Sequence, residues 1–234
     1  MTSVDHVVIS VADLQGASRR WQAAGLPPTF GGTHPWGTAN AVVRGPDRAY
    51  LELISATDLQ SAIATRVRQS PGPLSWALGV DDIERARAAL VERGYAPGPS
   101  MPSSRTTPGG DRLSWLLCDV AASPMHAFVP FLIQWTTPMP PGPAQGPVLT
   151  AVTLAVPSPA DLSAVLQVCG LTEAGGPAGC HLTDGVVDVV LRDGPGHVSE
   201  LSVVLPDGPA GDVVLDGVTV HRRKARAASP LSDS

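Results

Sequence analysis

The chain has 234 residues, of which 43% are hydrophobic, and a formal net charge of −5, which fits one large or two small globular domains with an ample core. No apolar run approaches the roughly 20 residues of a membrane span, and the mild negative charge gives no reason to expect nucleic acid as a partner. Three widely spaced cysteines, Cys118, Cys169 and Cys180, give no sign of a disulfide framework and favour a cytoplasmic location.

The first predicted unit covers residues 4–56 and has the order strand, helix, strand, strand. Its elements are a strand at 4–11, a helix at 13–24, a Gly-rich loop at 31–37 and strands at 38–44 and 50–55. Asp13 is suited to be the N-cap of the helix. The chain enters this first strand within a few residues of Met1, so we expect no signal peptide.

The second predicted unit covers residues 73–137 and repeats this order. Its elements are a strand at 74–80, a helix at 82–93, a loop at 104–106 and strands at 113–118 and 131–135. Each unit is too small to bury its own sheet, so the two should pair. We therefore predict an α+β fold in which paired βαβββ modules form a curved mixed sheet around a cleft, with the helices outside.

A Pro-rich linker at 138–147 is predicted to follow this domain, which ends at residue 137. Residues 148–221 read as a third, degenerate βαβββ-like module, and 222–234 as a disordered tail whose basic residues are solvated. An odd module has a sheet face or edge that must be covered. It either packs on the first two modules or pairs with its copy in a homodimer.

The alternation of side chains along the first strand predicts which of them face the cleft. If Val7, Ile9 and Val11 pack on the helix, then His6 points to the opposite face. The same register in the second unit turns Ser75 to that face. Glu52, in an apolar strand, needs a partner because an unpaired buried carboxylate is very costly. We therefore predict that the side chains of His6 and Glu52 converge in one cleft.

Three segments of the chain resemble the vicinal oxygen chelate superfamily, which contains glyoxalases, bleomycin-resistance proteins and extradiol dioxygenases. They are Asp5-His6-Val7-Val8 leading to Asp13-Leu14, the loop at 31–40 with His34, and Tyr50-Leu51-Glu52-Leu53-Ile54. In the second unit, Ser104-Arg105, Trp115 and the strand at 130–135 add to the resemblance. It covers residues 4–137 and is closest to the glyoxalase-like branch.

Enzymes of that superfamily bind a divalent metal between paired modules, so the resemblance implies a metal site here. His6 and Glu52 match the ligand positions of the first module, a set suited to Zn, Ni, Mn or Fe. The second module departs from the pattern, because Ser75 stands where a His would and Gln134 is the best match to the second carboxylate. A salt bridge between His6 and Glu52 would satisfy both residues without a metal.

Four further residues are candidates for binding a ligand in the cleft. His34 can bind a substrate oxygen or cap its turn, and Asn40 can line the cleft from the third strand. Trp36 can form a wall. Arg105 can hold an anionic group with two hydrogen bonds or remain a surface charge. Trp76, Trp115 and Trp135 are more typical of a core than of ligand stacking.

Two classes of function follow from these residues. One is a metal-dependent lyase or isomerase of the glyoxalase type, acting on a small oxygenated molecule with Glu52 as a ligand or proton carrier. The other is a metal-free protein that sequesters a small ligand, as drug-resistance members of the superfamily do, and Ser75 favours it. A third, weaker reading is a catalytically silent module whose third repeat serves assembly.

Overall fold

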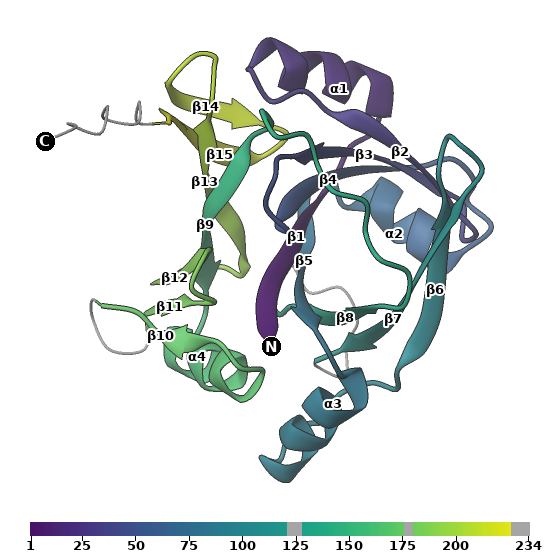
Figure 1. Ribbon diagram of the computed structural model, residues 1–234. Coiled ribbons are helices and arrows are strands. Elements are labelled where there is room, and N and C mark those ends of the chain that lie inside the picture. The colour runs from purple at the N-terminus through teal and green to yellow at the C-terminus, as the bar shows by residue number, and fades with distance from the viewer. Residues whose placement is uncertain (121–127, 176–179, 226–234) are drawn as a thin grey trace, which may run out of the picture.

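The computed structural model describes residues 1–120, 128–175 and 180–225 of the chain. The first half of the chain closes into an eight-stranded barrel with the strand order β1-β4-β3-β2-β6-β7-β8-β5 (Figure 1). Its elements are β1 (Thr2–Ser10), α1 (Leu14–Ala23), β2 (Thr29–His34), β3 (Thr38–Arg44), β4 (Tyr50–Ala56), α2 (Ala62–Gln69), β5 (Gly72–Val80), α3 (Ile83–Glu92), β6 (Met101–Thr106), β7 (Arg112–Asp119) and β8 (Phe131–Trp135).

The two halves of the barrel are the two predicted modules, and they pair within one chain. β4 runs parallel to β1, and β8 runs parallel to β5. β1 and β5 pair with each other in antiparallel fashion. The predicted paired modules with outer helices are confirmed, and α1 and α3 lie outside the barrel in Figure 1.

Helices α1 and α3 begin and end where their sequences predict. The side chain of Asp13 accepts a hydrogen bond from the backbone N–H of Gln15, and that of Asp82 from Arg85. Each helix is followed by a glycine with a positive φ, Gly25 at 79° and Gly94 at 84°, which a residue with a Cβ rarely adopts. These caps turn each module back toward its next strand.

Two segments predicted as loops are strands that close the barrel. β2 contains Gly31 and Gly32, and β6 contains Ser104 and Arg105. The two strands meet through the pair Thr33 and Thr106. The curved sheet expected around a cleft is therefore closed into a barrel, and the cleft is the interior of that barrel.

Helix α2, which the sequence pattern did not reveal, covers part of the barrel interior. Its residue Val67 packs against Val8, Ile54 and Leu74, and Val8 and Ile54 also line the cavity inside the barrel. The carbonyl of Val67 also accepts a hydrogen bond from the hydroxyl of Ser10. These contacts fill the part of the interior next to β1, β4 and β5 and leave the rest as a cavity.

The second half of the chain forms a seven-stranded sheet with the order β10-β11-β12-β9-β13-β15-β14. Its elements are β9 (Val148–Val156), α4 (Pro159–Val168), β10 (Thr172–Glu173), β11 (His181–Thr183), β12 (Asp188–Asp193), β13 (His197–Leu205), β14 (Gly211–Leu215) and β15 (Val218–Lys224). No helix of the described ranges is both long and apolar enough to span a bilayer.

This sheet contains more than the single degenerate module expected for 148–221. β9, α4 and β10 to β12 form a βαβββ unit, in which β12 runs parallel to β9. β13 then pairs antiparallel with β9, and β15 runs parallel to β13, as β5 and β8 do in the barrel. The sheet therefore holds a fourth module, without a helix and with one strand fewer. The strand β15 also extends to Lys224, so residues 222–224 are not part of a disordered tail, and residues 226–234 lie outside the described residues.

The second sheet packs on the barrel within the same chain, and one hydrophobic core runs through both. Asp216, at the turn between β14 and β15, joins the two halves: it pairs with Arg20 and accepts a hydrogen bond from Trp21 Nε1 at 2.8 Å. It has φ 43°, a backbone conformation in which Asp is enriched. One alternative for the third unit, packing on the first two modules, is therefore observed.

The Pro-rich segment at 138–147, which joins β8 to β9, lies against the barrel. A Cβ on Gly45, in the turn after β3, would lie 2.4 Å from the carbonyl oxygen of Pro147, and one on Gly146 would lie 2.2 Å from that of Arg44. Both distances are too short for a side chain. The glycines therefore let the backbone of segment 138–147 approach the turn after β3 closely.

Candidate functional site in the barrel

The structure brings His6 and Glu52 together inside the barrel, as predicted. His6 lies on β1 and Glu52 on the neighbouring parallel strand β4, where Glu52 pairs with Val8. Their side chains point to the same inner face, with 3.5 Å between Nε2 of His6 and Oε2 of Glu52. Both are buried. A base and an acid in contact can exchange a proton, so this pair is the centre of the candidate site.

Asp5 fixes the orientation of the His6 ring. Its Oδ1 lies 2.6 Å from His6 Nδ1, and its Oδ2 accepts a hydrogen bond from Trp135 Nε1 at 3.0 Å. An ionised carboxylate only accepts hydrogen bonds, so this contact assigns a proton to Nδ1 and turns Nε2 toward Glu52. The His6 ring also stacks on Tyr50, with 4.8 Å between the ring centroids. Asp5 is part of the first sequence motif, but nothing in the sequence pattern assigns it this role.

Asn40 connects Glu52 to Arg105. Its Nδ2 donates to Oε1 of Glu52 at 2.6 Å, and its Oδ1 accepts from Nη1 of Arg105 at 3.1 Å. Asn40 comes from β3 and Arg105 from β6, so the chain of contacts crosses from the first module to the second. The amide fixes the carboxylate while keeping the guanidinium away from it.

His34 lies beside the same carboxylate, with 3.9 Å between its Nε2 and Oε1 of Glu52. Its Nδ1 contacts the hydroxyl of Thr38 at 2.8 Å, and its ring stacks on Trp36 with 4.7 Å between centroids. Burial lowers the pKa of His34 below its ordinary value, although the charge of Glu52 acts in the opposite direction. His34 is therefore a neutral imidazole at pH 7.

Aromatic and aliphatic side chains form the rest of the cavity, whose volume is about 180 Å³. Trp115 and Trp135, expected in the core, belong to its wall, whereas Trp76 is fully buried in the core as expected. Tyr50 and Phe131 also line it, and burial raises the pKa of Tyr50 well above its usual value, so its phenol stays protonated. A mostly apolar cavity with a few convergent polar groups is the usual form of a small-molecule site.

Gln134 does not belong to the site, and its prediction as a metal ligand is wrong. Alternate residues of β8, namely Phe131, Ile133 and Trp135, line the cavity, so Gln134 points to the other face of the strand. There its Oε1 accepts a hydrogen bond from the backbone N–H of Ile83 at the start of α3. The side chain caps a helix, and the residue of β8 that corresponds to Glu52 is Phe131, three positions earlier.

The strand pairing shows what stands in the second module where the first has His6 and Glu52. Ser75 lies seven residues before the helix cap Asp82, as His6 lies seven before Asp13. Val8 pairs with Glu52, and its counterpart Ala77 pairs with Phe131. The second module therefore contributes a hydroxyl and a phenyl ring, neither of which is an ordinary metal ligand.

The residues of the barrel do not fit the divalent metal that the superfamily implies. In the ranges 1–120, 128–175 and 180–225, no three His, Cys, Asp or Glu side chains form a group that could hold a metal ion. Glu52 Oε1 already accepts a short hydrogen bond from Asn40, and the charge of Arg105 acts on His34 in the same cluster. A nearby guanidinium opposes the binding of a second cation, so no step proposed below passes through a metal.

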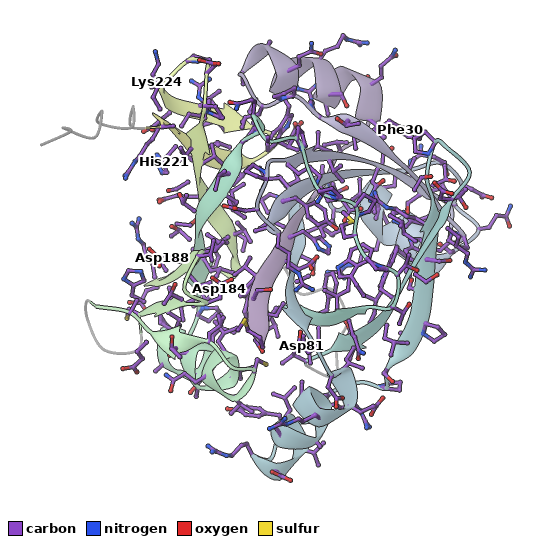
Figure 2. The ribbon with its side chains drawn as sticks, in the orientation of Figure 1. Phe30, Asp81, Asp184, Asp188, His221 and Lys224 are labelled. Carbon is purple, nitrogen blue, oxygen red and sulfur yellow. The ribbon has the colours of Figure 1, made fainter. Side chains whose placement is uncertain are left out.

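The second sheet carries a related contact at the corresponding positions of its last module. His221 and Glu200 stand where the barrel has Phe131 and Ser75, according to the strand pairing, and they lie 3.4 Å apart. Figure 2 shows His221 on the side of this sheet that faces away from the barrel. A hydrogen bond with Asp212 raises the pKa of His221. Both side chains of this contact are half-buried.

Solved structures share this fold at low sequence identity. A hypothetical protein from Staphylococcus aureus has a TM-score of 0.78 and 13% identity, and the match covers 96% of this chain and 100% of that one. The 2,3-dioxygenase LapB from Pseudomonas sp. KL28 has a TM-score of 0.55 and 13% identity, with 99% and 95% covered. A mutant of 4-hydroxymandelate synthase from Streptomyces coelicolor has a TM-score of 0.54 and 16% identity, with 88% and 71% covered. No curated protein matches the sequence.

The family assignment rests on a sequence match to the whole barrel and part of the second sheet. The model of the glyoxalase-like domain family matches residues 4–169, more than half of the 234 residues. The paired βαβββ modules are the fold of the superfamily that the sequence resembles. The chain therefore belongs to the glyoxalase-like domain family, within the vicinal oxygen chelate superfamily.

Proposed function

We propose that the barrel cavity binds a small oxygenated molecule and that Glu52 and His6 transfer a proton on it without a resident metal. Such a proton transfer is a step that a lyase or an isomerase can use. The observation that carries the proposal is the 3.5 Å contact between His6 Nε2 and Glu52 Oε2 inside an aromatic cavity. The free thiols of Cys118, Cys169 and Cys180 support a reducing compartment such as the cytoplasm.

Glu52 is the proton carrier in this proposal. Its Oε1 is held by Asn40, so Oε2 is the oxygen that can take a proton from a carbon next to a carbonyl group. His6 receives that proton at Nε2 or returns it to a neighbouring atom, while Asp5 keeps the ring in place through Nδ1. General acid–base catalysis of this kind contributes typically 10²–10⁴-fold to a rate.

Hydrogen exchange at an activated carbon tests the proposal with a neutral probe. Phenylacetone is dissolved in D₂O with the protein and EDTA, and the loss of its methylene proton signal is followed by NMR. We expect exchange above the buffer rate, and we expect Glu52→Gln to reduce it by about 100-fold or more, since the amide cannot accept the proton. Glu92→Gln, an equal charge change at an exposed residue, is the control and should leave the rate unchanged. Equal rates for wild type and Glu52→Gln would overturn the proposal.

Sequestration of a small ligand is the second candidate function. Ser75 and Phe131 favour it, because they stand in the second module where the first has His6 and Glu52. The second module therefore offers neither an imidazole nor a carboxylate for proton transfer. In this case phenylacetone or a similar molecule would bind without exchange of its protons. The same NMR samples therefore separate the two functions, since line broadening of the probe reports binding and loss of its signal reports chemistry.

A further inference from the structure

Arg105 is a buried cation whose hydrogen-bonding capacity is largely unused. Its exposed fraction is 5%, and it lines the cavity. A guanidinium has five N–H donors. Among the described residues, Asn40 Oδ1 is the one oxygen that accepts from it, and Nε has no partner. Nη2 has the sulfur of Met139 at 3.9 Å, which is a weak acceptor.

Glu52 does not neutralise this cation directly. Asn40 stands between Arg105 and Glu52, accepting from one and donating to the other. A buried charge without a paired counter-charge is costly, and an ion pair between the two residues would have removed that cost. The arrangement instead keeps a positive group available inside the cavity.

A second, independent observation points the same way. Trp36 also lines the cavity, and its Nε1 is a buried donor without a partner in the described part of the chain. The unpartnered atoms of the cavity wall, Trp36 Nε1 and Arg105 Nε, are both donors. A ligand that satisfies them must be rich in acceptors, and an anion is the acceptor that a guanidinium binds best.

The backbone leaves room for the Arg105 side chain. A Cβ on Gly31 would lie 2.2 Å from Nη1 of Arg105 and 2.4 Å from Oδ1 of Asn40. Both contacts are too short, so a side chain at this position of β2 would displace the Arg105 and Asn40 side chains from their present positions. The absence of a side chain at Gly31 therefore helps to hold the guanidinium where it lies.

We infer that the ligand of this cavity is a small carboxylate, bound by Arg105, with an aromatic or compact apolar body against the tryptophans. This inference deepens the proposed function and rests on the same cavity. Its volume of about 180 Å³ suits a body near the size of benzene, which fills an apolar cavity of about 150 Å³. A carboxylate oxygen takes the place of the Met139 sulfur at Nη2.

Titration calorimetry with benzoate and with its neutral analogue benzamide tests the inference. Wild-type protein should bind benzoate about tenfold or more tightly than benzamide, since hydrogen bonds to charged groups are the stronger ones. Arg105→Gln should abolish this preference while leaving the affinity for benzamide within about twofold. Arg19→Gln, the same charge change at an exposed residue of α1, should keep it. Arg105→Lys, which retains the charge but not the fork, should keep only part of it.

The titration separates failure of the carboxylate site from failure of the proposed proton transfer. Equal affinities of wild type for benzoate and benzamide, or no binding of either, would overturn the inference, and this comparison needs no variant to fold. Retention of the preference in Arg105→Gln would also overturn it. If benzoate is preferred but phenylacetone shows no exchange that depends on Glu52, the proposed proton transfer fails while the carboxylate site stands.

Discussion

Asp5 holds His6 by a contact of 2.6 Å between Oδ1 and Nδ1, and this contact decides which ring nitrogen faces Glu52. Asp5 serves a second donor at the same time, because Trp135 Nε1 donates to its other oxygen. One buried carboxylate therefore orients both the imidazole of His6 and a ring of the cavity wall. The arrangement of the proposed proton-transfer pair depends on Asp5, a residue that does not line the cavity.

Replacing Asp5 by Asn should slow proton exchange of phenylacetone. An amide has one acceptor oxygen, so either His6 Nδ1 or Trp135 Nε1 loses its partner. Residues that orient a functional His typically contribute about 10–100-fold when mutated in metal sites, and we expect a loss in that range here. The ¹⁵N chemical shifts of His6 should report a changed tautomer in Asp5→Asn. Unchanged shifts together with an unchanged rate would show that Asp5 is only structural.

Ser75 offers a stability test of the altered second module. Its hydroxyl is buried and has no hydrogen-bond partner in the described residues, whereas that of Ser10 donates to the carbonyl of Val67. An unsatisfied buried polar group costs about 1–3 kcal/mol. Ser75→Ala should therefore raise the free energy of unfolding by about 1 kcal/mol, and Ser10→Ala should lower it by a similar amount. Urea denaturation measures both, and a loss of stability in Ser75→Ala would contradict the account.

Asp216 should contribute substantially to the stability of the contact between the second sheet and the barrel. Asp216→Ala removes the ion pair with Arg20 and the hydrogen bond from Trp21, and it places a residue less suited to φ 43°. We expect a loss of about 2 kcal/mol in thermal or urea unfolding. Asp216→Asn tolerates the same backbone and can still accept from Trp21, so its loss should be smaller. Equal losses for the two variants would assign the effect to the ion pair alone.

Two histidines should give opposite pH dependences of stability. The pKa of His34 is lowered by burial from its ordinary 6.5, so the folded state resists its protonation, and stability falls as the pH drops below 6.5. The pKa of His221 is raised, chiefly by its hydrogen bond with Asp212, so its contribution is present below 6.5 and fades as the pH rises through the raised pKa. In urea unfolding from pH 5 to 8, His34→Gln should reduce the acid loss. His221→Gln should instead lower the free energy of unfolding most at acid pH. A change in the free energy of unfolding that is the same at every pH, in either variant, would refute the role given to that histidine.

The barrel and its central pair were predictable because short-range patterns decide them. Strand alternation places His6 and Glu52 on one face, and the acidic caps Asp13 and Asp82 mark the two modules. Gln134 was matched to Glu52 in place of Phe131, because the short strand β8 is apolar on both sides and alternation gives no register there. Which residues of β8 face the cavity is decided by the pairing of β8 with β5, and that pairing is seen only in the structure.

Other features depend on contacts that the sequence does not display. β2 and β6 contain Gly, Ser and Arg, which are typical of loops, and they become strands because each completes the barrel's closing pair. The fourth module lacks a helix, so the strand–helix repeat that revealed the first two modules is absent there. The role of Asp5 likewise follows from the distance to its neighbour His6, since adjacent residues of a strand normally point to opposite faces.

Crystals grown with benzoate and zinc chloride together test the central claim, that this barrel holds a small ligand at His6, Glu52 and Arg105 without a metal. Anomalous diffraction at the zinc edge locates any metal, and the difference density locates benzoate. We expect benzoate in the cavity with its carboxylate on Arg105, and no zinc peak between His6 and Glu52. A zinc ion bound by His6 and Glu52, with no benzoate at Arg105, would contradict it.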